Sequence, residues 1–164
     1  MRYRAPNSAP CRDRRGYPAG IYRETHSSVR SEGLRRRDDL LVVDLGGVKA
    51  VVMICFDVEF LEVARALAGA DLPVTVSANM TPFGRDHGVF ATAHALEHGT
   101  PHLYVNQAGR GKAITFVGGT MAVSAHGDHP VGAGVSGKTV VRLRLDTAVG
   151  NPVRPEESKL NYLK

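Results

Sequence analysis

Cys55 is the side chain in this sequence best suited to attack a substrate. It follows the apolar residues 51–54, and it precedes Phe56, Asp57 and a helix-like spacing of apolar residues. This order predicts a buried strand that delivers the thiol to its carboxyl end, with Asp57 placed to cap the next helix. The free N–H groups of that helix would favour the nucleophilic thiolate. The alternative is a packing role, since free cysteines are often buried in protein cores.

The elements that must position Cys55 follow from the pattern of apolar residues. Two strands are expected at residues 40–44 and 48–54, joined by a turn at Gly46 and Gly47. The other expected elements are a helix over residues 58–69, a strand over 73–78, an amphipathic helix over 86–98 with Val89, Ala93 and Leu96 on one stripe, and strands over 103–107, 116–124 and 139–145. Residues 1–21 show no such period, and taken alone they would be assigned to disorder.

Charge is distributed unevenly along the chain. The 164 residues carry a net charge of +5, but residues 1–37 hold ten Arg and three acidic residues, whereas the remainder holds eleven basic and thirteen acidic residues. A basic arm could bind phosphates. Its Arg residues are scattered among Pro, Gly and Ser with few aromatic residues between them, which argues against nucleic acid as a partner.

The cysteine content and hydropathy predict a soluble, cytoplasmic domain. The sequence is 43% hydrophobic, which is enough for one core. It has no run of 18 apolar residues and no signal-peptide pattern, so no membrane association is expected. Only two cysteines are present, and Cys55 has a better use as a thiol than in a disulfide, which favours a reducing compartment.

Four separated motifs resemble the carbon-nitrogen hydrolases of the nitrilase superfamily. They are ICFDVEF around Cys55, SANMTPFG, ALEHG through YVNQAG, and FVGGTMAVS. The first is similar to the family's I-C-Y-D-x-E-F-P-E around its catalytic cysteine, with Phe56 and Leu61 in place of Tyr and Pro. The resemblance implies an α/β fold, an α-β-β-α sandwich that here lacks its N-terminal part. It places a partial hydrolase domain at residues 21–146, after a poorly matching basic segment (1–20) and before a polar tail (147–164) that is expected to be extended.

The resemblance also implies a catalytic set of Glu, Lys and Cys. This sequence departs from that set at the lysine. IYRETH is similar to the family's Y-R-K-T-H-L, so Glu24 occupies the lysine position, and the general-base glutamate would belong to the missing N-terminal part. Glu32 lies eight residues after Glu24 and matches a supporting glutamate of the family by spacing. A carboxylate at position 24 would repel the oxyanion that lysine stabilises.

Residues 27–37 match the family poorly, and a shifted reading frame is one explanation. With suitable codons and one added nucleotide, SSVRSEG would read LFGAERR, which is closer to the family pattern. Glu32 would then match by accident.

The implied activity is cysteine-dependent hydrolysis of a non-peptide amide or N-carbamoyl C–N bond, without a cofactor. Cysteine followed by Phe and Asp resembles the amidase and carbamoyl-amidase branches more than the true nitrilases. The loop at 79–84 follows a strand, where α/β sheets bind ligands, and Asn79, Met80 and Phe83 are candidate substrate-binding residues. With Glu24 at the lysine position, the chain is expected to be impaired. The alternative is a non-catalytic remnant that interacts with a full-length relative. The family is commonly dimeric, so a homo-oligomer is expected.

Three histidines could be considered as metal ligands, but the sequence does not support a metal site. His87, His94 and His98 are spaced by seven and four residues on one predicted helix. No cysteine or carboxylate set completes a site, and the resembled family needs no metal. We therefore expect no metal ligands.

Overall fold

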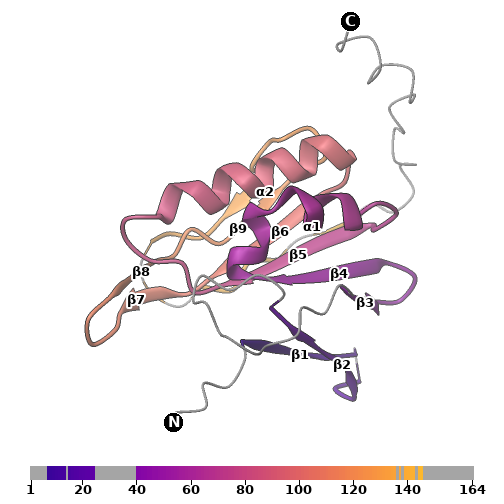
Figure 1. Cartoon of the computed structure of the whole chain (residues 1–164), viewed down its shortest axis with the longest axis horizontal. Helices are drawn as coiled ribbons and strands as arrows, with labels where there is room; N and C mark the ends of the chain where they lie inside the picture. The colour runs from indigo at the N-terminus through magenta and orange to yellow at the C-terminus, as the bar shows by residue number, and fades with distance from the viewer. Residues whose placement is uncertain are drawn as a thin grey trace, which may run out of the picture.

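The computed structural model describes residues 7–13, 15–24, 40–135, 137, 139–142 and 144–145 (Figure 1). Its centre is a six-stranded sheet in the order β10-β9-β6-β5-β4-β3. The strands of this sheet are β3 (Leu41–Asp44), β4 (Lys49–Ile54), β5 (Leu72–Ser77), β6 (His102–Asn106), β9 (Met121–Val123) and β10 (Val131–Gly132). A separate two-stranded ribbon is formed by β7 (Ala108–Arg110) and β8 (Thr115–Val117). None of the described helices is long and apolar enough to span a membrane.

The three central strands are parallel, which brings their carboxyl ends to one edge of the sheet. β5 pairs in parallel with both β4 and β6, whereas β3, β9 and β10 pair antiparallel with their neighbours. Every residue of β4 from Ala50 to Ile54 is buried, as expected for a central strand covered on both faces. The predicted strands at 40–44, 48–54, 73–78 and 103–107 are confirmed, as is the turn at Gly46 and Gly47.

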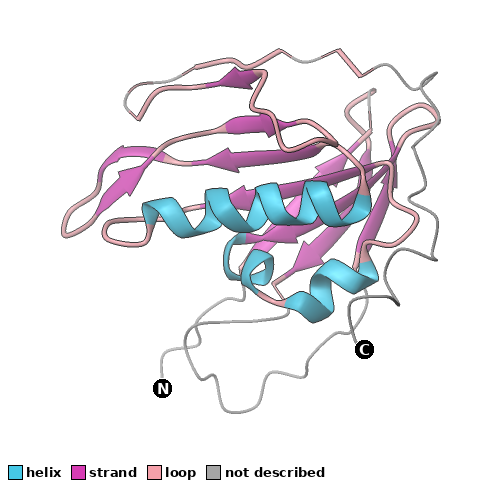
Figure 2. Ribbon diagram, turned by 90° about the horizontal axis from the view of Figure 1, so that it is seen from above, coloured by secondary structure: helices cyan, strands magenta, loops and turns pink. Residues whose placement is uncertain are grey.

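Both α-helices cover the same face of the sheet, as Figure 2 shows from above. The chain leaves β4 through a 3₁₀ turn (η1, Cys55–Glu59) and continues into α1 (Leu61–Ala66). Val51 and Met53 of β4 pack on this side against Val63 and Leu67. The left-handed Gly69, with φ of +85°, follows α1. The predicted helix over 58–69 is therefore shorter and begins as a tighter turn.

The opposite face carries a β-hairpin, which gives a helix, sheet and hairpin layering (Figure 1). β1 (Ser8–Arg12) pairs antiparallel with β2 (Pro18–Arg23), and Tyr22 packs with Val43, Val52 and Ile54 of the sheet. The disorder suggested by local composition is wrong for residues 8–12 and 18–23. The hairpin is stabilised by tertiary burial, which a local apolar count does not detect.

The long helix α2 (Gly84–His98) forms where expected but buries a different face. Val89 and Leu96 of the predicted stripe are 56% and 38% exposed, and Ala93 is also exposed. The buried side chains are His87, Ala91, His94 and Ala95. The prediction was wrong because histidine was counted as polar, whereas a neutral, hydrogen-bonded imidazole can be buried.

The expected strand over 139–145 is also absent from the described residues of that segment. Residues 139–142 and 144–145 have no strand assignment, and Val140 is 82% exposed. Alternating residues form a strand only where a neighbouring strand supplies backbone partners. The alternation in TVVRLRL was therefore misleading.

Candidate active site

Cys55 stands directly after β4, at the carboxyl edge of the parallel strands. Its backbone has φ of +48°, which makes it the one non-glycine residue with positive φ among those described. A non-glycine residue in this region is conformationally strained, and the surrounding structure must hold it there. The thiol is partly buried and forms no disulfide. The predicted strand that ends at the cysteine is confirmed, whereas the helix that was expected directly after it is preceded by a 3₁₀ turn.

Asp57 stabilises this turn from within, as the third residue of the 3₁₀ turn, and its carboxylate takes part in the capping box of that turn instead of serving as the predicted N-cap. Its Oδ2 accepts a hydrogen bond from the Ile54 N–H at 3.1 Å and another from the Tyr22 hydroxyl at 2.9 Å. Asp57 is fully buried, and its carboxylate bonds to the backbone of the residue that precedes Cys55. The hairpin residue Tyr22 therefore helps to fix the backbone on either side of the thiol.

A chain of polar side chains begins at the Cys55 thiol. The Ser77 hydroxyl, at the carboxyl end of β5, donates to Cys55 Sγ at 3.4 Å. Ser77 Oγ also lies 3.2 Å from Nδ1 of His87, and Nε2 of His87 lies 3.0 Å from Oε1 of Glu59. The Tyr104 hydroxyl lies 3.3 Å from the same Nδ1 atom. Strand β5, helix α2 and the 3₁₀ turn thus converge beside the thiol.

Burial controls the protonation of this polar chain. Burial lowers the pKa of His87, although the nearby Glu59 and Asp86 carboxylates oppose that change. Burial raises the pKa of Tyr104, which also hydrogen bonds with Ser77 and Asn79. At neutral pH both groups are therefore uncharged, and the imidazole can accept a proton.

Glu24, which the sequence motifs predict at the family lysine position, lies close to the backbone of Phe56. Its Oε2 accepts a hydrogen bond from the Asn7 side chain at 2.8 Å, and its carboxylate also accepts the backbone N–H of Phe56. Burial raises the pKa of Glu24, and the negative charge of Asp57 adds to that increase. The N–H that follows the nucleophile is thus engaged by a carboxyl group. Glu32 lies outside the described residues.

The predicted substrate loop after β5 is tightly organised by Asn79. The Asn79 amide donates to the Phe83 carbonyl at 2.9 Å, while its Oδ1 accepts the Met80 N–H at 2.8 Å. Its own backbone N–H donates to Oδ1 of Asn106, at the end of β6. Met80 is partly buried and Phe83 is 56% exposed. The roles of Asn79, Met80 and Phe83 in substrate binding stay predictions.

The three helix histidines lie in different environments. His87 belongs to the polar chain at Cys55, whereas His94 Nε2 bonds to the Val58 carbonyl at 2.7 Å and its ring stacks on His102. Burial, with further contributions from His94 and His98, lowers the pKa of His102 to about 3. Across the described part of the chain, no group of three or more His, Cys, Asp or Glu side chains is arranged to hold a metal ion.

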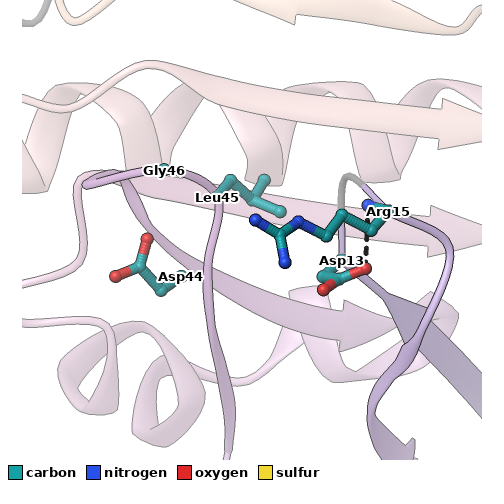
Figure 3. Close-up of a pocket in the computed structure, with 5 residues that line it drawn as sticks. All are labelled: Asp13, Arg15, Asp44, Leu45 and Gly46. Carbon is teal, nitrogen blue, oxygen red and sulfur yellow. Dashed lines mark hydrogen bonds between the residues drawn. The ribbon is translucent and has the colours of Figure 1, made fainter.

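One surface pocket lies away from Cys55 (Figure 3). It is lined by Asp13 and Arg15 from the β1–β2 turn and by Asp44, Leu45 and Gly46 from the β3–β4 turn. These turns lie at the amino end of β4, whereas Cys55 follows its carboxyl end. Oδ1 of Asp13 accepts the backbone N–H of Arg15 at 2.8 Å, as the dashed line shows. This pocket contains no nucleophile, so the candidate active site is the group around Cys55.

Residues 3–154 match the family model described as carbon-nitrogen hydrolase. The chain belongs to the carbon-nitrogen hydrolase family. Its fold agrees with that of the amidase from Nesterenkonia sp. AN1, which is 27% identical and superposes with a TM-score of 0.76 over 95% of this chain and 63% of that protein. The expected α/β hydrolase fold and the family resemblance are thereby confirmed.

Two curated relatives of this carbon-nitrogen hydrolase come from Pseudomonas. An (R)-stereoselective amidase of Pseudomonas sp. is 37% identical over 118 residues, which are 67% of this chain and 43% of the amidase. A hydrolase encoded 5′ of pqqF in Pseudomonas protegens is 32% identical over 143 residues, or 82% of this chain and 49% of the hydrolase. The chain thus spans about half the length of the curated relatives it matches.

A structure of the Nesterenkonia amidase records chemistry at its active-site cysteine. In a glutamate-to-glutamine mutant, the acetamide moiety of fluoroacetamide is covalently added to that cysteine. This structure is 27% identical and superposes with a TM-score of 0.70 over 78% of this chain and 51% of that protein.

Sequence reasoning missed Ser77, Glu59 and Tyr104 as neighbours of the thiol. Ser77 and Glu59 lie inside the motifs SANMTPFG and ICFDVEF, but no spacing rule linked them to each other. His87 was considered only as a metal ligand. A usable signal was the position of Ser77 at the end of the strand next to that of Cys55, because carboxyl ends of adjacent parallel strands meet.

Proposed function

We propose that this carbon-nitrogen hydrolase cleaves a non-peptide amide or N-carbamoyl C–N bond with Cys55 as nucleophile. The observation that carries the proposal is Cys55 in a strained elbow at the sheet's carboxyl edge, within the family motif and 3.4 Å from a serine hydroxyl. The thiolate would attack the carbonyl carbon to form a tetrahedral intermediate. Expulsion of ammonia or an amine leaves a thioester, which water hydrolyses.

The substrate side of the site is proposed to be the loop of residues 79–84. Asn79, Met80 and Phe83 follow the strand next to that of Cys55, and the exposed Phe83 ring offers an apolar contact. The Nesterenkonia amidase has been solved with butyramide, which supports small amides as the first compounds to test.

We expect turnover to be slow because of Glu24. The carboxyl group of Glu24 engages the Phe56 N–H, which as the donor after the nucleophile is the type of group that forms oxyanion holes. Negative charge would have to develop next to a carboxylate. Loss of one member of a cooperative catalytic set costs on the order of 10⁴-fold in rate.

The test combines labelling of the thiol with measurement of turnover. Fluoroacetamide should add covalently to Cys55, located by peptide mass spectrometry, and ammonia release from butyramide and an N-carbamoyl amino acid should be slow. Both signals should vanish in Cys55→Ala. Labelling elsewhere, or equal ammonia release by the wild type and Cys55→Ala, would refute the proposed activity.

The alternative function is a non-catalytic protein that binds a full-length relative. The observation in its favour is the sheet face opposite the helices, where Val105 is 43% exposed and Val76 is only partly buried. Co-purification with such a relative, together with absence of turnover, would support this alternative. A monodisperse monomer that releases ammonia would exclude it.

A further inference from the structure

We propose that Glu59, His87 and Ser77 form a proton relay that activates Cys55. The relay rests on the proposed function, since it would accept the proton of the Cys55 nucleophile. It uses three side chains that come from the 3₁₀ turn, α2 and β5. The sequence motifs assign no such role to any of them.

The distances define one continuous path from the thiol to a carboxylate. Cys55 Sγ and Ser77 Oγ are 3.4 Å apart, and Ser77 Oγ and His87 Nδ1 are 3.2 Å apart. On the far side of the ring, Nε2 of His87 is 3.0 Å from Oε1 of Glu59. Each step is within hydrogen-bonding distance, and thiol contacts are longer because sulfur is larger.

Glu59 determines which ring nitrogen of His87 can act as base. The carboxylate accepts a hydrogen bond from Nε2–H, so Nδ1 carries the lone pair that faces the hydroxyls of Ser77 and Tyr104. This is the role of the orienting acid in hydrolase triads, where the carboxylate fixes the tautomer and stabilises the imidazolium. Glu59 is therefore a positioning residue in this relay.

The protons balance without movement of heavy atoms. The Cys55 thiol proton passes to Ser77 Oγ while the Ser77 hydroxyl proton passes to His87 Nδ1, which leaves a thiolate and an imidazolium. The thiolate forms the S–C bond with the substrate. When the C–N bond breaks, the imidazolium returns its proton through Ser77 to the leaving nitrogen. In the structure the Ser77 hydroxyl donates to Cys55 Sγ, so it must first rotate toward His87 Nδ1 before the transfer, and afterwards it can donate to the thiolate.

The surroundings of His87 suit a neutral base. The imidazole is 3% exposed, and its burial lowers its pKa. Two carboxylates lie near the imidazole, Glu59 from the 3₁₀ turn and Asp86 from its own helix. Two hydroxyls face it, those of Ser77 from β5 and Tyr104 from β6. Strand β9 has no titratable side chain. The Tyr104 ring packs edge-on against the imidazole at 5.9 Å, which restricts its orientation.

The relay is tested by the rate at which iodoacetamide alkylates Cys55 between pH 6 and pH 10. The full chain is used in a Cys11→Ala background, so that Cys55 is the single thiol. This readout reports thiolate formation and needs no amide turnover. Failure of the relay can therefore be distinguished from failure of the proposed hydrolysis.

We expect His87→Gln and Ser77→Ala each to slow alkylation about tenfold at pH 7. The difference should vanish near pH 10, where the thiol ionises without a base. The double variant should be no slower than either single variant, because both break the same path. Ser77→Thr keeps the hydroxyl and should recover most of the rate.

The matched control is His102→Gln, which replaces another fully buried histidine that contacts Thr75 and not Cys55. It should alkylate at the wild-type rate, with circular dichroism confirming the fold of each variant. Unchanged alkylation in His87→Gln at pH 7 would overturn the relay. A loss that persists at pH 10, or that is additive in the double variant, would instead indicate a general structural effect and would equally overturn it.

Discussion

At the scale of single residues, the environment of Cys55 combines features that favour attack with one that opposes it. The strained backbone and the Ser77 contact present the thiol at the sheet edge. Glu24, in contrast, brings a carboxyl group to the Phe56 N–H. Activation of the nucleophile and stabilisation of the oxyanion are separate requirements, so substitutions can test them independently.

We expect Glu24→Lys to increase ammonia release from butyramide roughly 10²-fold, because an ammonium would replace a carboxylate where the oxyanion forms. Glu24→Gln is the control, since it removes the charge without adding a cation, and its gain should be about tenfold. Steady-state ammonia release measures both. A Lys variant no faster than the wild type would show that Glu24 is not what limits turnover.

At the scale of elements, the packing of α2 on β6 involves the buried ring of His102. His102 is fully buried, hydrogen bonds to Thr75 Oγ1 at 2.9 Å, and stacks with His94 of α2. Burial is the main cause that lowers its pKa to about 3, with added repulsion from His94 and His98. A proton on this ring would leave a buried charge between the helix and the sheet.

This predicts acid destabilisation of the fold. The folded-state pKa of His102, about 3, lies below the unfolded value of about 6.5, so only the unfolded state gains a proton as pH falls. The loss of folding stability caused by His102 is small above pH 6.5 and grows as pH falls toward 3. From pH 7.5 to pH 5 it should lower the free energy of unfolding by about 2 kcal/mol.

Urea unfolding at the two pH values measures this effect. In His102→Gln, the decrease in the free energy of unfolding between pH 7.5 and pH 5 should be smaller by about 2 kcal/mol. The control is His126→Gln, at an exposed histidine, which should show the same decrease as the wild type. Identical pH dependence in the wild type and His102→Gln would contradict the assignment.

At the scale of the whole molecule, the two faces of the sheet are covered unequally. Helices α1 and α2 pack on one face, while the hairpin covers β4 on the other (Figure 1). Val105 of β6 is exposed. An apolar face of this kind favours association with another surface. The homo-oligomer that the family resemblance implies stays a prediction, which this face makes testable.

We expect the chain to self-associate through this face and Val105→Lys to shift it toward the monomer. A lysine there would bring a charge into the apolar contact. Light scattering after size-exclusion chromatography measures the mass. Val89→Lys is the control, because Val89 is an exposed valine on α2, on the other side of the sheet. If Val89→Lys alone dissociates the oligomer, the helical face is the contact.

The sequence by itself determined the elements near Cys55 and the family. The strands before and after the cysteine and the turn at Gly46 and Gly47 could be predicted because they depend on short-range patterns of apolar and turn residues. Family motifs identified Cys55 as the nucleophile candidate. They also predicted that Glu24 occupies the family lysine position.

Only the tertiary structure decided which side chains surround the thiol. Ser77, His87 and Tyr22 are separated from their partners by 10 to 35 residues, and strand order alone brings them together. The buried face of α2 was missed for a related reason, and local composition alone did not indicate the β1–β2 hairpin. Contacts with distant elements stabilise the burial of a neutral histidine or of a single tyrosine. Local hydropathy carries no information about such contacts.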